Sequence, residues 1–189
     1  MENFSKRFCM ILFLLCFQLC SLTSCKKTKS EISVTELDKL PPISQTGANT
    51  FGCLINGKAF LPNGGGVNTV PLKCLYDPNY GGGDLSIRAK NFINANDFIS
   101  ITLNLRPFTS PGTFSLSFGG PFGVSYFNTI ASCNFTTYDP PSPTIVYGTL
   151  LITSFSNLNR IISGTFSYKV NTSSCGFVEV TYGRFDLKF

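Results

Sequence analysis

Residues 98–105, FISITLNL, alternate apolar and polar side chains from Ile99 onward. One face carries Ile99, Ile101, Leu103 and Leu105, and the other carries Ser100, Thr102 and Asn104. A period of two residues is the geometry of a β-strand that buries one face. We therefore predict a strand here, ended by Arg106-Pro107 because proline has no amide hydrogen to donate to a neighbouring strand.

The same pattern recurs on both sides of this stretch. Residues 51–61 predict a hairpin, because Asn56-Gly57 suits a type I′ turn. Further strands are predicted at 72–76, 84–90, 113–118, 124–127, 131–138, 146–154, 161–170 and 178–189. Within 113–118, we expect Phe114, Leu116 and Phe118 to point inward. Residues 146–154 are more continuously apolar, which is typical of a strand covered on both faces.

The last strand contains two apolar sets of opposite parity. Val178, Val180 and Tyr182 form one set, and Phe185, Leu187 and Phe189 form the other. A strict period of two cannot bury both sets on one face. One extra residue restores the alignment, so we predict a β-bulge near Gly183.

The composition supports an all-β fold. Phe, Thr, Ser, Gly, Asn and Ile are abundant after residue 50, and no stretch shows a sustained helical period. Roughly ten strands are more than a single sheet usually holds. We predict an antiparallel β-sandwich, with a lipocalin-like barrel as the alternative.

The N-terminus indicates export. Lys6 and Arg7 precede the apolar run 8–19, and small residues then lead to Cys25. This order is typical of a signal peptide. The run Leu22-Thr23-Ser24-Cys25 resembles the lipobox of bacterial lipoproteins, in which the cysteine receives a diacylglycerol and becomes the new N-terminus.

These features divide the chain into three parts. Residues 1–24 are predicted to be the lipoprotein signal peptide, residues 25–50 a lipidated cysteine with a flexible tether, and residues 51–189 one all-β domain. Several acyl chains hold a protein stably at a bilayer. We therefore expect a monomer anchored by lipid to the outer membrane, on its periplasmic face or at the cell surface.

Four cysteines lie in the predicted domain: Cys53, Cys74, Cys133 and Cys175. An even number in an exported domain favours disulfides, with three connectivities to choose from. Pairing of sequence neighbours, Cys53 with Cys74 and Cys133 with Cys175, is the first hypothesis. The alternative is that some are free, buried, apolar side chains.

Both ends of the domain resemble a family. Residues 51–58, FGCLINGK, open the domain, and 162–168, ISGTFSY, with 178–186, VEVTYGRFD, close it. Together with the lipobox, these motifs resemble uncharacterised Bacteroidota lipoproteins. The resemblance implies an exported, lipid-anchored β domain and brings no catalytic residues.

Several functions are disfavoured by what the chain contains. It has no histidine, which removes Ser-His-Asp and Cys-His catalysis and histidine-ligated metals. No spacing of acidic residues proposes a carboxylate pair, so we expect a protein that is not an enzyme and binds no metal or cofactor. Residues 51–189 carry nine Lys and Arg against six Asp and Glu without a basic stripe, which argues against nucleic acid.

Tyrosines are the remaining candidates for ligand contact. Tyr76, Tyr80, Tyr126 and Tyr138 lie at or near predicted loops. Tyrosine pairs a flat apolar ring with a polar tip, which suits glycans and peptides. We expect a binding or interaction module for a glycan or protein ligand. The alternatives are a structural or assembly accessory of the envelope and, third, a carboxylate-based hydrolase.

Overall fold

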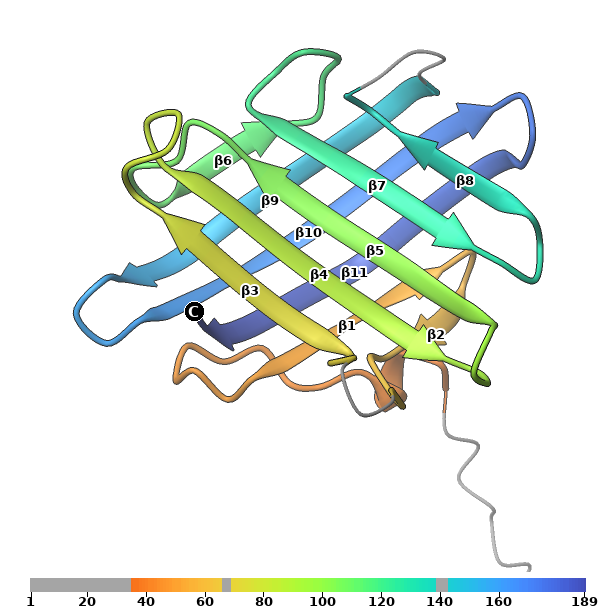
Figure 1. The fold of residues 1–189 in the computed structure, drawn as a ribbon, viewed down its shortest axis with the longest axis horizontal. Coiled ribbons are helices and arrows are strands. Elements are labelled where there is room, and N and C mark those ends of the chain that lie inside the picture. The colour runs from red at the N-terminus through yellow and green to blue at the C-terminus, as the bar shows by residue number, and fades with distance from the viewer. Residues whose placement is uncertain (1–34, 66–68, 139–142) are drawn as a thin grey trace, which may run out of the picture. The chain divides into compact units, whose positions relative to one another are not determined.

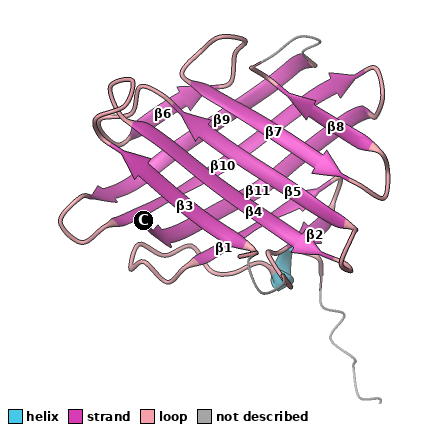
Figure 2. Cartoon of the chain, viewed as in Figure 1, coloured by secondary structure: helices cyan, strands magenta, loops and turns pink. Residues whose placement is uncertain are grey.

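The computed structural model describes residues 35–65, 69–138 and 143–189. The signal peptide and Cys25 predicted from the sequence lie outside these residues. Within them the chain forms two stacked antiparallel sheets (Figures 1 and 2). A single turn of 3₁₀-helix, Leu37–Lys39, precedes the first strand. No helix in the described part of the chain is long and apolar enough to cross a membrane.

Sheet A has six strands in the order β2-β1-β11-β10-β9-β6. Its strands are β1 (Thr50–Ile55), β2 (Lys58–Phe60), β6 (Gly112–Ser115), β9 (Thr144–Ser156), β10 (Ile161–Thr172) and β11 (Gly176–Lys188). Sheet B has five strands in the order β3-β4-β5-β7-β8. They are β3 (Leu72–Asp77), β4 (Asp84–Phe92), β5 (Phe98–Leu105), β7 (Phe122–Asn128) and β8 (Cys133–Thr136).

The predicted sandwich is confirmed. In the described residues the two sheets share no strand, so they do not close into the alternative barrel. Their strands cross in the view of Figure 1, where sheet B lies in front of sheet A. The described part of the chain forms eleven strands, where roughly ten were expected.

The core lies between the facing surfaces of the sheets. On β5, Ile101, Leu103 and Leu105 are all at most 1% exposed, as their alternation predicts. Burying such a side chain contributes about 1.5–3 kcal/mol. Sheet A supplies matching residues such as Leu150 and Ile162. The polar alternate residues of both sheets are therefore left on the two outer faces.

The predicted bulge is present in β11. Gly52 and Leu54 of β1 pair with Arg184 and Thr181, so β11 has one more residue than its neighbour over this interval. Tyr182, within it, has φ +53° and is exposed. The extra residue puts Val178, Val180, Phe185 and Leu187 all into the core.

The predicted hairpin at the domain start is confirmed as well. Asn56 and Gly57 have φ values of +46° and +78°, as a type I′ turn requires. The Asn56 side chain also accepts a hydrogen bond from the Glu179 amide at 2.8 Å. The turn is therefore fixed to β11.

Two sequence expectations about burial are wrong. Phe118 does not point inward but is 60% exposed, because β6 ends at Ser115 and a turn follows. Strand β9 is covered on one face only, and Val146 and Leu151 are exposed on the other. A register shift against β10 lies at Val146, whereas Leu151 alternates regularly between the buried Leu150 and Ile152 and is an apolar residue on the outer face.

The boundary predicted at residue 51 is too late. Leu40 is buried, and residues 44–48 lie on the outer face of sheet A against Asp186. Asp186 is 1% exposed. Its carboxylate accepts hydrogen bonds from Ser44 Oγ, Thr46 N and Oγ1, Gly47 N, Ala48 N and Ser163 Oγ. This segment is therefore part of the folded unit and not a flexible tether.

One of the two hypothesised disulfides forms. Cys133 at the start of β8 is bonded to Cys175 in the turn between β10 and β11, which ties sheet B to sheet A. Cys53 and Cys74 are free thiols, so their predicted pairing is wrong. They lie on β1 and β3, in different sheets. Burial raises the pKa of both thiols, that of Cys74 to about 12.

Candidate functional site

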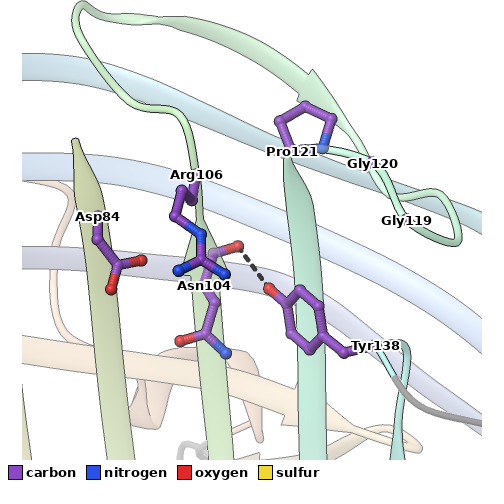
Figure 3. Close-up of a pocket in the computed structure, with 7 residues that line it drawn as sticks. All are labelled: Asp84, Asn104, Arg106, Gly119, Gly120, Pro121 and Tyr138. Carbon is purple, nitrogen blue, oxygen red and sulfur yellow. Dashed lines mark hydrogen bonds between the residues drawn. The ribbon is translucent and has the colours of Figure 1, made fainter. Parts of the chain in front are cut away.

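A polar pocket of about 450 Å³ opens at one end of sheet B (Figure 3). Its lining residues are Asp84, Asn104, Arg106, Gly119, Gly120, Pro121 and Tyr138. They come from β4, β5, the loop before β7, and the residues just after β8. The pocket therefore draws on four segments that are far apart in the sequence.

Strand parity places the polar groups of the pocket. Leu105 points into the core, so Asn104 and Arg106 on either side point outward. Asp84 is the first residue of the neighbouring β4 and occupies the same outer face. In Figure 3 the Arg106 side chain lies between Asp84 and Tyr138. An anionic, a cationic and two neutral polar side chains thus meet in one pocket.

Gly123 on β7 allows Tyr138 to reach the pocket. The Tyr138 ring occupies the space where a side chain at position 123 would begin. From there its hydroxyl donates a hydrogen bond to the carbonyl oxygen of Asn104, at 3.1 Å. Tyr138 therefore lies across β7, held at its tip by β5.

The environment of Tyr138 keeps it protonated. Burial raises the pKa of its hydroxyl to about 12, although the hydrogen bond to Asn104 and the charge of Arg106 oppose the shift. At neutral pH the tyrosine is uncharged. It therefore offers a ring face and a hydroxyl oxygen with spare capacity to accept hydrogen bonds from a ligand.

Arg106 is exposed and held in place by an aromatic ring. Its guanidinium lies 5.0 Å from the centre of the Tyr80 ring. Within the residues that the structure describes, it forms no salt bridge. A guanidinium presents five donors in a fixed plane, which suits carboxylates, phosphates and vicinal hydroxyls. Arg106 is thus available to a ligand.

The four tyrosines proposed as ligand contacts fall into two pairs. Tyr138 lines the pocket, and the ring of Tyr80 lies beside the Arg106 guanidinium. Tyr126 is 3% exposed and stacks on Phe135, so it is a core residue. Tyr76 packs edge-on against Phe108, Phe155 and Phe189. The rings of Tyr76 and Tyr126 are therefore used in packing, and neither residue lines the pocket.

Sequence reasoning missed Asp84, Asn104 and Arg106 as site residues. The parity of 98–105 already put Asn104 and, one step beyond the strand, Arg106 on the outer face. The sequence did not show that β4 pairs with β5, or that the chain after β8 returns to the pocket. Both depend on contacts between distant residues.

The groups of this pocket can form hydrogen bonds and an ion pair with a ligand. Its lining contains one carboxylate, that of Asp84, whereas glycoside hydrolysis of the usual kind uses two. Across residues 35–65, 69–138 and 143–189, no group of three or more Cys, Asp or Glu side chains is placed to hold a metal ion.

A second hollow, of about 420 Å³, lies on the outer face of sheet A and is more apolar. Ile43, Leu151 and Tyr182 line it, and each is more than a third exposed. The bulge in β11 places Tyr182 there, and the lining residue Arg184 donates a hydrogen bond to the carbonyl oxygen of Pro41. Arg184 is the charged residue in its lining, which contains no carboxylate or side-chain amide.

Comparison of the chain with protein-family models, curated proteins and solved structures finds no match.

Proposed function

We propose that this protein is a lipid-anchored, non-enzymatic binding module of the cell envelope that recognises a glycan or a peptide. Its binding site is the pocket lined by Asp84, Asn104, Arg106 and Tyr138. The folded unit presents this pocket, and the lipidated N-terminus retains the protein at the outer membrane.

One observation carries the proposal: a donor-rich cation, a carboxylate, an amide and a phenol converge in a single pocket. Specific ligand sites are typically concave, with a few polar groups that fix the orientation of the ligand. Tyr80 and Tyr138 add aromatic faces beside Arg106. This combination matches the hydroxyls and apolar ring faces of sugars, and equally the charged and amide groups of peptides.

The binding assignment is tested with glycan and peptide arrays probed with the purified protein. We expect Arg106→Ala to weaken binding of any hit at least tenfold, since it removes the unpaired cation. Tyr182→Phe is the matched control, because Tyr182 is exposed on the opposite sheet. Hits that respond to Tyr182→Phe and not to Arg106→Ala would move the site to sheet A.

The anchor is supported by the sequence pattern around Cys25, which lies outside the described residues. Cys25→Ala is expected to abolish acylation and to release the protein from the membrane fraction. Metabolic labelling with a fatty acid and fractionation measure both effects. If the variant remains acylated and membrane-bound, the lipoprotein assignment is wrong.

The rival proposal is a structural or assembly accessory, and the apolar hollow with Ile43, Leu151 and Tyr182 on sheet A favours it. A protein partner covering this hollow would be lost on Leu151→Glu and retained on Arg106→Ala. Cross-linking in intact cells with both variants separates the two proposals.

A further inference from the structure

Three cations gather on the outer face of sheet B. Lys73 and Arg88 are direct cross-strand partners on β3 and β4, and Lys90 follows two residues later on the same face of β4. We call Lys73, Arg88 and Lys90 the cationic cluster. Like charges directly opposite each other destabilise a sheet. The fold therefore carries an electrostatic cost at this position.

No acidic side chain of the described residues forms a salt bridge with the cluster. Among the described residues the salt bridges are Lys39 with Glu36 and Lys169 with Glu179, and none of these four lies on sheet B. Two acids, Asp77 and Asp84, lie on the same face. They are cross-strand neighbours at the far end of β3 and β4. Four residues of strand, about 13 Å, separate Asp84 from Arg88.

Lys90 lies against two aromatic rings and close to the charge of Arg88. Its ammonium lies 4.4 Å from the centre of the Phe98 ring and 5.7 Å from that of Phe92. Partial burial, and then the charge of Arg88, lower the pKa of the Lys90 ammonium. An anion bound here would relieve the repulsion between the two cations.

A row of hydroxyls continues the cluster across the sheet. The register aligns one residue from each strand in the order Lys73, Arg88, Thr102, Ser125 and Thr136. The next row toward the pocket aligns Ser86, Asn104 and Gly123, and Tyr138 lies over Gly123. In Figure 1 these five strands form the layer nearest the viewer. The cluster and the pocket thus share one face.

We propose that the ligand of this face is an acidic polysaccharide that lies along sheet B, with anionic groups on the cationic cluster and one sugar residue in the Arg106 pocket. This inference rests on the proposed binding function and names its ligand class. Charge complementarity selects a polyanion. The adjoining hydroxyl row and the polar pocket select sugar over a lipid surface, because they supply short-range partners for sugar hydroxyls.

The test compares dextran sulfate and a polyuronate with unmodified dextran, using the full mature chain in detergent. The variant K73Q/R88Q removes two charges from the cluster. The control K58Q/K169Q removes the same net charge from sheet A. Both sites are at the surface, and K73Q/R88Q should unfold at the same temperature as the original chain or higher, because it removes the like-charge pair.

We expect both acidic polymers to bind more tightly than dextran, and binding to weaken as salt rises. K73Q/R88Q should reduce affinity about tenfold, the order expected for two exposed charge contacts, and K58Q/K169Q should leave it within about twofold. Equal losses of affinity in the two variants would mean that the polymers are attracted nonspecifically by the charge of the protein, and would overturn the inference.

Two further outcomes would also overturn it. One is cluster-dependent binding to phosphatidylglycerol vesicles without binding to either acidic polymer, which would assign the face to a membrane. The other is array hits that are neutral glycans or peptides, sensitive to Arg106→Ala and insensitive to K73Q/R88Q. In that second case the proposed binding function would stand without the acidic ligand.

Discussion

Asp186→Asn is expected to destabilise the fold strongly, because Asp186 joins residues 44–48 to sheet A. Its Oδ1 atom accepts two buried hydrogen bonds, one from Gly47 N at 2.7 Å and one from Ser163 Oγ at 2.8 Å. Hydrogen bonds to a charged acceptor contribute about 1.5–3 kcal/mol each. The amide keeps one oxygen but turns an NH₂ group toward the remaining donors. We therefore expect a loss of about 3 kcal/mol in the free energy of unfolding.

The effect has a defined pH dependence. Burial alone would raise the pKa of the Asp186 carboxyl, but hydrogen bonds from Ser44, Thr46, Ser163 and Gly47 hold it well below the ordinary value of 3.8. A carboxyl with a lowered folded-state pKa stabilises the fold above its unfolded-state pKa. That contribution is lost as pH falls through the folded-state pKa. The difference in the free energy of unfolding between the original protein and the Asp186→Asn variant should thus be constant above about pH 5 and shrink below it.

Urea unfolding followed by circular dichroism from pH 7 down to pH 2.5 measures both features. The matched control is Asp97→Asn, since the hydrogen bonds that Asp97 accepts from Asn94 and Thr129 are exposed to solvent. The control should change stability by less than about 1 kcal/mol. Hydrogen exchange at the Gly47 amide reports the local effect. An Asp186→Asn protein as stable as the original, or a difference that does not shrink in acid, would refute this reasoning.

Three further predictions concern the core and the cysteines. The Tyr168 hydroxyl is fully buried and has no hydrogen-bond partner among the described residues, so Tyr168→Phe should stabilise the fold by about 1 kcal/mol in the same urea assay. An equal loss of stability would instead indicate a partner such as a bound water. Thiol titration of the mature protein, unfolded without reductant, should find two free thiols, Cys53 and Cys74, once Cys25 is acylated. Replacing Cys133 and Cys175 by serine opens a 42-residue span and should cost up to about 4 kcal/mol; no change in stability would show that the bond does not form.

Local pattern predicted much of the fold correctly. The alternation in 98–105 gave the buried and exposed faces of β5, and Asn56-Gly57 gave the hairpin turn. The parity conflict in the last strand gave the bulge near Gly183. Each of these features depends on residues that are close in the sequence. Prediction failed at Phe118 and across β9, where a strand end and register shifts interrupt the period.

The candidate site was much less accessible to sequence reasoning. Of the four proposed tyrosines, Tyr138 lines the pocket and Tyr80 lies beside the Arg106 guanidinium. Tyr76 and Tyr126 lie within β3 and β7, whereas Tyr80 and Tyr138 follow β3 and β8. Which ring is used in packing depends on how the two sheets face each other.

The sequence by itself determined the strands, their buried faces and the bulge, because side chains alternate along a strand whatever it pairs with. Only the tertiary structure decided which strands are neighbours, and with them the pocket at Arg106, the row from Lys73 to Thr136 and the capture of residues 44–48 by Asp186. Those contacts join groups up to 142 residues apart. They arise from strand register and from the satisfaction of buried polar groups, which no local period encodes.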